Sequence, residues 1–329
     1  MHPTSPPPAA PPPPAVVCLG ETMAVLTPSS AGPLHTSDAL NLRTGGAESN
    51  VAASLAGLGH RSAWLGRVGD DPFGRRVLAD LAARGVATDA VETDPDRPTG
   101  LYLKEPVDGA TRPHYYRAGS AASALGPGLP APELLATAAV VHVTGITAAL
   151  SDSCRRLLHT LLVERAVPGP LLTFDVNHRA ALWRGSREPA AEVLLTLARA
   201  ADLVLVGRDE AAALWGTEHP DEIRALLAPA PRLVVKDADV GATSYTPDGD
   251  SVFVAAPRVD VVEPVGAGDA FAAGYLAGLL EERPEPARLR LGHLAARAAL
   301  TTTDDVPRMP PRHDIDPLLA PDAPWSTAP

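Results

Sequence analysis

Cysteine is scarce in this sequence: the 329 residues include two, Cys18 and Cys154. Two thiols cannot build the disulfide framework of a small secreted domain, and they are too few for a cysteine-based zinc site. Long apolar stretches are missing as well, because no segment approaches the roughly 20 apolar residues that a membrane-spanning helix needs. These absences predict a cytoplasmic protein without a membrane partner.

Positive charge is also in short supply. There are 28 Lys and Arg against 39 Asp and Glu, which gives a formal net charge of −11. An acidic chain repels a phosphodiester backbone, so the composition predicts no nucleic-acid partner. A single pocket can still have the opposite sign, and a small acidic substrate remains open.

Proline is abundant, with 36 residues, but its distribution is uneven: eight lie in residues 1–14 and seven follow Val306. Polyproline favours an extended, solvated chain, so residues 1–14 are predicted to be a disordered tail. This tail lacks the basic start and apolar run of a secretory signal. Residues 304–329 are predicted to be a second proline-rich tail, in which Ile315, Leu318 and Leu319 could anchor a turn. The domain between the tails is expected at residues 15–303.

Short apolar runs alternate with helix-like segments along this domain. Buried strands are expected at 15–20, 138–143, 171–175, 202–206 and 232–235, and helices at 49–59, 72–85, 152–166, 188–200, 208–215, 221–228, 267–281 and 287–301. This alternation predicts an α/β fold with a mainly parallel central sheet flanked by helices. Residues 21–44 and 98–118 break the pattern, because they look like strands with no helix to cover them. They are expected to form a small β-sheet lid over the carboxyl ends of the main strands.

The most informative stretch reads Glu263-Pro-Val-Gly-Ala-Gly-Asp-Ala-Phe271 and comes directly before a long helix. Unpaired amides of Gly266, Ala267 and Gly268 at the positive end of that helix would make an anion site suited to a phosphate. Asp269 places a carboxylate beside them, as a base accepting a proton from an attacking hydroxyl would require. Two alternatives are a dinucleotide fingerprint, which normally opens the first βαβ unit, and a plain helix start capped by Asp269.

A second glycine motif, Gly45-Gly-Ala-Glu-Ser-Asn50, precedes another helix, and Arg67-Val-Gly-Asp-Asp-Pro-Phe-Gly74 follows it. In this order and on this fold pattern, the motifs resemble the ribokinase-like (PfkB) carbohydrate kinases over about residues 15–303. The resemblance implies a Rossmann-like sheet with a β lid, and ATP and Mg²⁺ as cofactors. It implies that Asp269 is the catalytic base and that Gly266, Ala267 and Gly268 stabilise the transferring phosphoryl group.

Three positions depart from the family pattern. Val265 replaces a residue with a hydroxyl, which puts dependence on a monovalent cation in doubt. The segment Gly207-Arg-Asp-Glu210 keeps the acid but loses an amide, and Glu210 is expected to orient Mg²⁺ through water. Asp209 in the same role and a solvated acid at a helix start are the alternatives. In the nucleotide loop from Lys236 to Gly241, Ala238 replaces a glycine, at a cost of about 1 kcal/mol if that position needs a positive φ. The ATP-binding set implied by the resemblance is Gly207, Lys236, Gly241, Gly266, Gly268 and His293.

Aromatic residues make up 4% of the chain, yet three of the five tyrosines, Tyr102, Tyr115 and Tyr116, fall in the expected lid. Tyr115 and Arg117 share one strand face, with Tyr116, expected in the lid core, on the other. Arg179 follows the end of a core strand. If Arg117 and Arg179 converge, their guanidinium groups would suit a carboxylate.

The segments around these arginines, Tyr115-Tyr-Arg-Ala-Gly-Ser-Ala-Ala-Ser123 and Asp175-Val-Asn-His-Arg-Ala-Ala-Leu-Trp183, are similar to those of 2-keto-3-deoxygluconate kinases. The implied substrate-binding set is Gly46, Asn50, Tyr102, Tyr115, Arg117, Arg179 and Asp269. A fructokinase or ribokinase, the galacto epimer as substrate, a non-catalytic sugar-acid or nucleotide sensor and an NAD-linked dehydrogenase remain alternatives. The edge of the lid sheet predicts a homo-oligomer formed through the lid.

Overall fold

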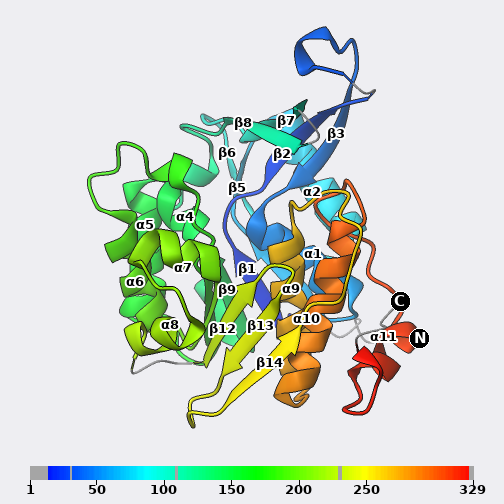
Figure 1. Cartoon of the computed structure of the whole chain (residues 1–329). Coiled ribbons are helices and arrows are strands. Elements are labelled where there is room, and N and C mark those ends of the chain that lie inside the picture. The colour runs from blue at the N-terminus through cyan, green and yellow to red at the C-terminus, as the bar shows by residue number, and fades with distance from the viewer. Residues whose placement is uncertain (1–13, 30–31, 108–109, 229–231, 326–329) are drawn as a thin grey trace, which may run out of the picture.

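The computed structural model describes residues 14–29, 32–107, 110–228 and 232–325. A large central sheet is covered by helices on both faces, and a smaller sheet projects from one end of it (Figure 1). The predicted α/β fold with a lid is therefore confirmed. The predicted N-terminal tail, residues 1–14, lies outside the described residues except for its last residue.

The central sheet has eight strands in the order β14-β13-β12-β11-β10-β9-β1-β4. The strands are β1 Val16–Leu19, β4 Ser62–Leu65, β9 Val140–Thr144, β10 Leu171–Asp175, β11 Leu203–Gly207, β12 Arg232–Asp237, β13 Gly241–Tyr245 and β14 Ser251–Ala255. All neighbours from β4 to β12 are parallel, whereas β12, β13 and β14 form an antiparallel meander at one edge. The five predicted strands are present. Strands β4, β13 and β14 were not predicted; β13 mixes glycine with polar residues and so lacks an apolar run.

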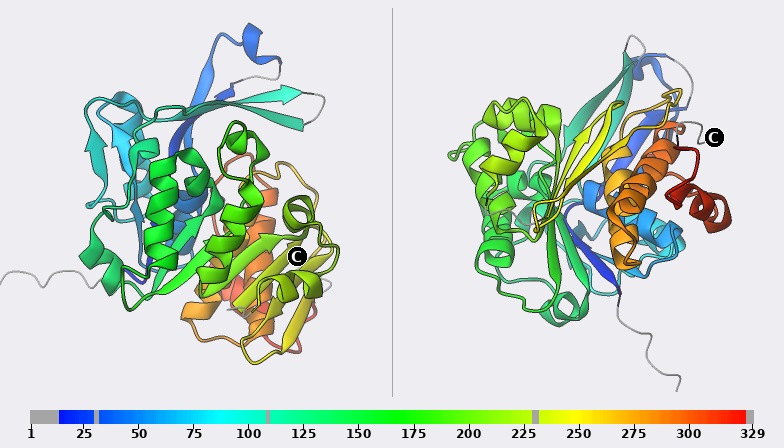
Figure 2. Two further views of the ribbon diagram at one scale, coloured as in Figure 1. Left: turned by 90° about the vertical axis from the view of Figure 1, so that its left-hand side faces the viewer. Right: turned by 60° about the horizontal axis from the view of Figure 1, so that its bottom comes forward.

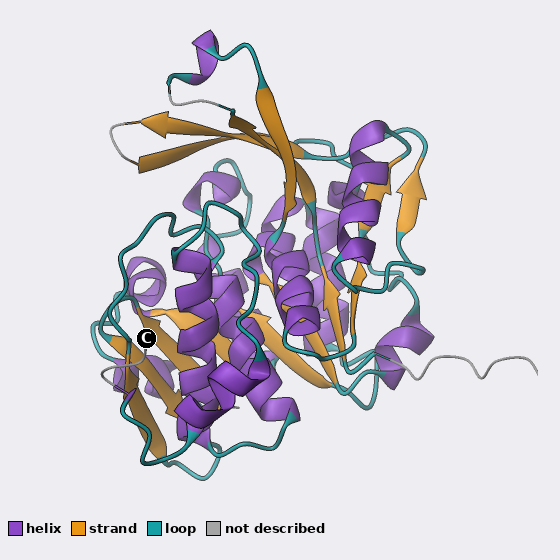
Figure 3. Cartoon of the chain, turned by 90° about the vertical axis from the view of Figure 1, so that its right-hand side faces the viewer, coloured by secondary structure: helices purple, strands orange, loops and turns teal. Residues whose placement is uncertain are grey.

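Helices cover this sheet in two layers (Figures 2 and 3). One layer contains α1 Ala47–Gly57, α2 Pro72–Ala83, α9 Ala267–Leu280 and α10 Glu285–Leu300. The other contains α3 Pro132–Thr137, α4 Gly145–Leu150, α5 Asp152–Leu158, α6 Ala190–Ala200, α7 Arg208–Trp215 and α8 Pro220–Leu226. Successive residues of β1 serve both layers, since Val16 and Cys18 belong to the core under α1 and α9 while Val17 and Leu19 belong to the opposite core. Alternation along buried strands therefore builds two cores from one sheet.

Local signals set where these helices begin. The Asp71 side chain accepts from the Gly74 backbone N–H at 2.8 Å and Pro72 follows it, so α2 starts with a cap and a residue preset for the first turn. The predicted helix 152–166 is shorter in the structure. The α-helix ends at Leu158, a π-helical turn, η3 His159–Val163, follows, and Arg165 adopts a positive φ of 53°.

The lid is a four-stranded sheet in the order β3-β2-β7-β8, built from the two predicted segments. Its strands are β2 Met23–Pro28, β3 Leu40–Gly45, β7 Leu101–Val107 and β8 Ala110–Tyr116, and a two-stranded sheet of β5 Arg67–Gly69 and β6 Glu92–Asp94 completes the strands of the described residues. Tyr102 is buried, and its ring centroid lies 5.4 Å from that of Tyr115. Tyr116 is 66% exposed, so the expectation that it belongs to the lid core is wrong. Tyr115, on the opposite face of β8, is 43% exposed, so neither face of the strand is covered at this end.

Residues 304–325 pack along the domain beside α10 (Figure 1). Ile315 and Leu319 are buried and Leu318 is packed against the same core, which confirms the anchoring turn; it consists of α11 Arg312–Ile315 and η5 Asp316–Leu319. Trp325 ends the described chain, and its Nε1 donates to the Ala255 carbonyl oxygen at 2.7 Å. Within residues 14–29, 32–107, 110–228 and 232–325, no helix is long and apolar enough to cross a bilayer.

Candidate active site

The two glycine motifs meet through a pair of polar side chains. Asn50, in the first turn of α1, donates from Nδ2 to Asp269 Oδ2 at 2.8 Å. Asn177, which follows β10, donates from Nδ2 to the other oxygen, Oδ1, at 3.4 Å. Asp269 lies in the first turn of α9, and α1 and α9 pack against each other. Both carboxylate oxygens are therefore oriented by amides at the carboxyl edge of the sheet.

The turn before Asp269, where the sequence predicts an anion site, depends on its two glycines. Gly266 caps α9 in the left-handed region, with φ 86° and ψ −11°, which a glycine adopts without strain. A Cβ atom built there would lie 2.3 Å from the Asp305 carbonyl oxygen, so the backbone also approaches too closely for a side chain. Gly268 is exposed, and an added Cβ would find Lys236 Nζ at 3.7 Å as its nearest neighbour. Gly268 therefore faces Lys236.

The environment of Asp269 favours its protonated form. Burial raises the pKa of this carboxyl to about 7, and the negative charge of Asp175 pushes the pKa in the same direction. The hydrogen bond from Asn50 and the positive charges of Arg179 and Lys236 oppose that rise. A carboxylate with a pKa near neutrality can both take and release a proton at physiological pH.

Lys236, at the end of β12, is the cation of this region. Its Nζ contacts Asp175 Oδ2 at 2.7 Å, and Asp175 is itself buried at the end of β10. The charges of Asp175, Glu210 and Asp269 outweigh burial and raise the pKa of Lys236, which therefore stays charged. The carboxyl ends of β10 and β12, on either side of β11, thus place one carboxylate and one ammonium near the turn before α9.

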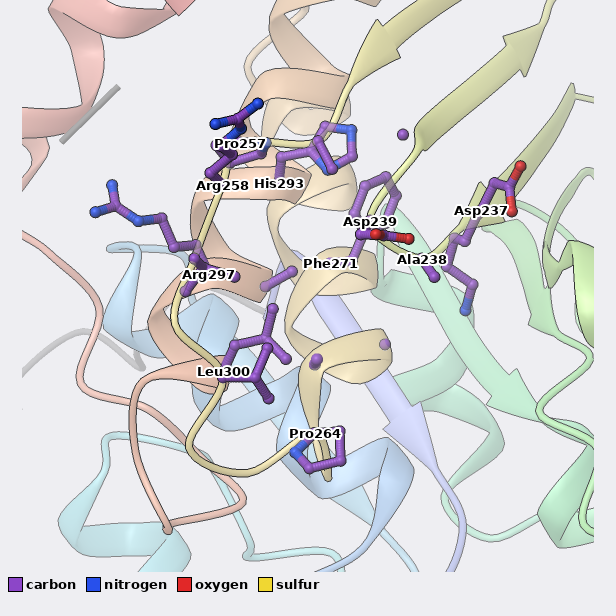
Figure 4. Close-up of a pocket in the computed structure, with 18 of the residues that line it drawn as sticks. Asp237, Ala238, Asp239, Pro257, Arg258, Pro264, Phe271, His293, Arg297 and Leu300 are labelled. Carbon is purple, nitrogen blue, oxygen red and sulfur yellow. The ribbon is translucent and has the colours of Figure 1, made fainter. Parts of the chain in front are cut away.

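A pocket of about 990 Å³ extends from this turn across β12, β13 and α10 (Figure 4). Its lining includes Lys236, Gly241, Gly268, Phe271 and His293. His293 Nε2 lies 3.0 Å from the Val254 carbonyl oxygen, and burial lowers the pKa of the imidazole to about 4, so the ring is neutral. The volume is sufficient for a nucleotide.

Ala238 lies in the hairpin between β12 and β13 and adopts a φ of 43°. The condition left open by the sequence is therefore met: the position has a positive φ, and an alanine occupies it. The hairpin keeps the shape of a glycine turn at the cost of backbone strain.

Glu210 binds backbone amides on two loops. Its Oε2 accepts from the Gly207 N–H at 2.9 Å and its Oε1 from the His178 N–H at 3.0 Å. Burial raises the pKa of this carboxyl, while the positive charge of Lys236 opposes the shift. Gly207 is the N-cap of α7, so Glu210 fixes the start of that helix against the loop after β10. Across the described segments, no group of three or more His, Cys, Asp or Glu side chains is arranged to hold a metal ion.

The two predicted arginines have different partners. Arg117 Nη2 pairs with Glu21 Oε2, its side chain is 9% exposed, and its guanidinium carbon lies 5.5 Å from the Tyr115 ring centroid. Arg179 is 51% exposed, with Nη1 3.1 Å from the His178 carbonyl oxygen and 3.6 Å from Glu210 Oε1. Arg179 therefore has the more accessible guanidinium, and its charge lowers the pKa of Asp269.

Several residues of this region were not identified from the sequence: Glu21, Asp175, Asn177 and Asp305. Asp175 and Asn177 follow a predicted core strand in the same segment as Arg179, so their position at the strand end could have revealed them. Glu21 and Asp305 had no comparable signal, since one follows the first strand as a single acid and the other lies in the expected C-terminal tail.

An open, mainly parallel sheet whose late helix begins at a glycine turn, with a carboxylate and a nucleotide-sized pocket beside it, is the arrangement expected of a small-molecule phosphotransferase. Residues 14–310 match the family described as pfkB family carbohydrate kinase. The chain belongs to this family and is an ATP-dependent carbohydrate kinase.

Relatives that are named for an activity match almost the whole chain. The sequence is 35% identical over 313 residues to the 2-dehydro-3-deoxygluconokinase of Thermoproteus tenax, covering 93% of this chain and 94% of the relative. It is 34% identical over 296 residues to the 2-dehydro-3-deoxygalactonokinase of Haloferax volcanii, covering 88% and 91%. The crystal structure of a PfkB protein from Polaromonas sp. JS666 is 33% identical, with a TM-score of 0.80, and the match covers 89% of this chain and 98% of that one.

Proposed function

We propose that this kinase phosphorylates 2-keto-3-deoxygluconate to 2-keto-3-deoxy-6-phosphogluconate. The observation that supports the sugar acid most directly is Arg179, an accessible guanidinium close enough to Asp269 to lower the pKa of its carboxyl. A substrate that places a hydroxyl at Asp269 would then meet a cation matched to its carboxylate. The relatives named for 2-dehydro-3-deoxy sugar acids support the same substrate class.

In the proposed reaction, Asp269 removes the proton of the 6-hydroxyl and the resulting oxygen attacks the γ-phosphorus of ATP. A new P–O bond forms to the sugar, the bond between the γ-phosphorus and ADP breaks, and Asp269 holds the proton. The amides of Gly266, Ala267 and Gly268 bind the charge that develops on the transferring phosphoryl group. Asn50 and Asn177 keep the carboxylate in place through their hydrogen bonds.

The proposed nucleotide set is Gly207, Lys236, Gly241, Gly266, Gly268 and His293, most of which line the 990 Å³ pocket. The proposed sugar set is Gly46, Asn50, Tyr102, Tyr115, Arg117, Arg179 and Asp269. Besides binding the sugar, Arg117 is proposed to hold the lid strand β8 over it, because Arg117 is paired with Glu21.

Glu210 is the residue of this region whose chemistry fits Mg²⁺. Each oxygen of Glu210 accepts one backbone N–H and keeps lone pairs for water. An ion that arrives with the ATP phosphates would be oriented by Glu210 through water, as hydrated Mg²⁺ usually is. When bound, the ion neutralises phosphate charge during the transfer.

The lid is also proposed as the surface of a homo-oligomer. Large apolar side chains stand exposed on it, namely Leu40, Val107, Tyr115 and Tyr116. Light scattering of the wild-type chain should give a mass above that of one chain, and a monomer at micromolar concentration would exclude a stable assembly. Since the reaction consumes ATP, the cytoplasm is the proposed compartment.

The substrate proposal is tested by ATP consumption with Mg²⁺ over 2-keto-3-deoxygluconate, its galacto epimer, fructose and ribose. We expect the two keto-deoxy acids to give values of kcat/KM well above those of the neutral sugars. If fructose or ribose exceeds both acids, the sugar-acid assignment is wrong and a fructokinase or ribokinase activity replaces it. Nucleotide binding without turnover of any sugar would favour a sensor.

A further inference from the structure

Asp305 lies between the two glycine motifs, although it follows the end of α10 by several residues. A Cβ at Gly45 would lie 2.6 Å from Asp305 Oδ2, and a Cβ at Gly266 would lie 2.3 Å from the Asp305 carbonyl oxygen. The turn before α9 therefore rests directly on the backbone of Asp305. The residue is buried, so this contact is made in the interior rather than on the surface.

The side chain of Asp305 is held by the lid. Tyr102 Oη donates to Oδ2 and Lys104 Nζ donates to Oδ1, both from strand β7. The Lys104–Asp305 ion pair is almost fully buried, with side chains 6% and 5% exposed. Buried pairs of this kind are geometrically demanding, because a displaced partner leaves an uncompensated charge in a low-dielectric environment.

A second carboxylate completes the cluster on the other side of the turn. Glu263 Oε2 lies 3.9 Å from Lys104 Nζ and accepts from the Thr111 hydroxyl at 2.7 Å, while its Oε1 accepts from the Val265 N–H at 3.3 Å. Lys104 thus lies between Glu263 and Asp305, which flank the anion turn. Both ends of that turn are connected to lid strands β7 and β8.

We propose that Asp305 and Lys104 are positioning residues that tie the seating of the lid to the shape of the Gly266–Gly268 turn. Neither residue touches the reacting atoms in the proposed reaction, on which this role rests. When the lid is seated, Lys104 and Tyr102 fix Asp305, and the backbone of Asp305 supports the left-handed conformation of Gly266. When that tie is lost, the amides of the turn no longer share one direction.

The test compares Asp305→Asn and Lys104→Met with Asp304→Asn. Asp304 is the matched control, since it is the neighbouring acid, is 48% exposed and makes a lid contact with Arg43 at the surface. Hydrogen exchange of the peptide containing residues 263–269 should rise about tenfold or more in the two buried variants and stay at the wild-type rate in the control. In the same variants kcat should fall about tenfold or more, with ADP affinity changed less than about threefold.

A double variant, Lys104→Met with Asp305→Asn, separates positioning from stability. The double variant returns the three-residue cluster to the net charge of the wild type, and Glu263 keeps its hydrogen bonds from Thr111 and the Val265 N–H, so the melting temperature should recover most of what Lys104→Met loses. If kcat and the exchange of the turn recover as well, the cluster is merely structural and the proposal is wrong. Exchange at wild-type rates in both single variants would also overturn it. Hydrogen exchange and ADP binding are measured without sugar. A wild-type chain that turns over none of the sugars would therefore contradict the proposed function, while the exchange result would still decide whether Asp305 and Lys104 connect the lid to the Gly266–Gly268 turn.

Discussion

Asn50 and Asp269 are 219 positions apart in the chain, yet the Asn50 amide donates to the Asp269 carboxylate at 2.8 Å. Each residue lies in the first turn of its helix, α1 or α9, directly after a glycine motif. The hydrogen bond therefore joins the two motifs at one point of the carboxyl edge of the sheet. One motif supplies the proposed base, Asp269, and the other orients its carboxylate.

Replacing Asp269 by Asn should abolish most of the turnover while leaving the fold intact. The amide introduced by Asp269→Asn can still accept from Asn50 through its oxygen. Asn177 has a buried Oδ1 without a partner in the described structure, and this oxygen can turn to accept from the introduced NH₂ group. A missing general base costs about 10²- to 10⁴-fold in kcat. Steady-state kinetics should show that loss in kcat with little change in the KM of the sugar, and near-normal kcat would remove Asp269 from the role of base.

The raised pKa of Asp269 makes two pH-dependent predictions. For the wild type, kcat/KM should rise with pH through an apparent pKa of about 7, because only the carboxylate accepts a proton. A profile flat from pH 6 to 8 would contradict the shifted pKa.

Stability should change in the opposite sense. Between the unfolded value of 3.8 and the native value of about 7, the native state holds a proton that the unfolded state releases, so the contribution of Asp269 to the free energy of unfolding falls as pH rises through this range. Asp269→Asn should therefore be more stable than wild type at pH 8 and should lose that advantage towards pH 4. Urea unfolding at both pH values measures the difference. Equal differences at both would show that the pKa is not raised.

Local patterns were enough to predict five of the eight strands of the central sheet, the lid and the glycine turn that begins α9. Gly266, Asp269 and Asn50 belong to short segments in which the glycines, the polar residue and the following helix occur together, so the chemistry can be recognised without tertiary information. Glu21 and Asp305 could not be recognised in that way. Their roles depend on how the lid and the C-terminal segment pack against the domain. That packing is determined by the shapes of both cores rather than by any residue nearby in the sequence.

The two motif glycines should fail in different ways when each is replaced by Ala. Gly266→Ala places a Cβ 2.3 Å from a backbone oxygen at a positive φ, and should lower both stability and activity. Gly268→Ala meets no atom closer than 3.7 Å and replaces glycine in the first turn of a helix, so stability should stay equal or rise by up to about 1 kcal/mol. The added methyl group still projects towards the proposed phosphate position and should reduce kcat/KM for ATP. Thermal melts and ATP kinetics separate the two, and full activity in Gly268→Ala would argue against phosphate binding there.

Replacing Arg179 and replacing Arg117 should have different effects, one on sugar binding and the other on stability. Arg179→Ala should raise the KM for the sugar acid about 10- to 100-fold with little change in melting temperature, since a charged hydrogen bond is lost from an exposed side chain. Arg117→Ala should destabilise the fold by about 3–5 kcal/mol, because Glu21 would be left buried without its partner. The exposed Arg184, at the end of η4 Ala180–Trp183, provides the control, and its replacement should change neither quantity. An unchanged KM in Arg179→Ala would mean that the carboxylate is bound elsewhere.

Ala238→Gly should stabilise the protein. Ala238 is held at a φ of 43°, where a Cβ costs about 1 kcal/mol or more, whereas the extra freedom of glycine in the unfolded chain returns about 0.4–1 kcal/mol of that. The net gain should be a fraction of 1 kcal/mol to about 1 kcal/mol, visible as a small rise in the midpoint of urea unfolding. Ala131, with a φ of 45° before α3, should behave in the same way, while Ala212→Gly on the exposed face of α7 should cost about 1 kcal/mol. If Ala238→Gly destabilises the protein as much as Ala212→Gly does, then Ala238 is not strained in the hairpin at the nucleotide pocket.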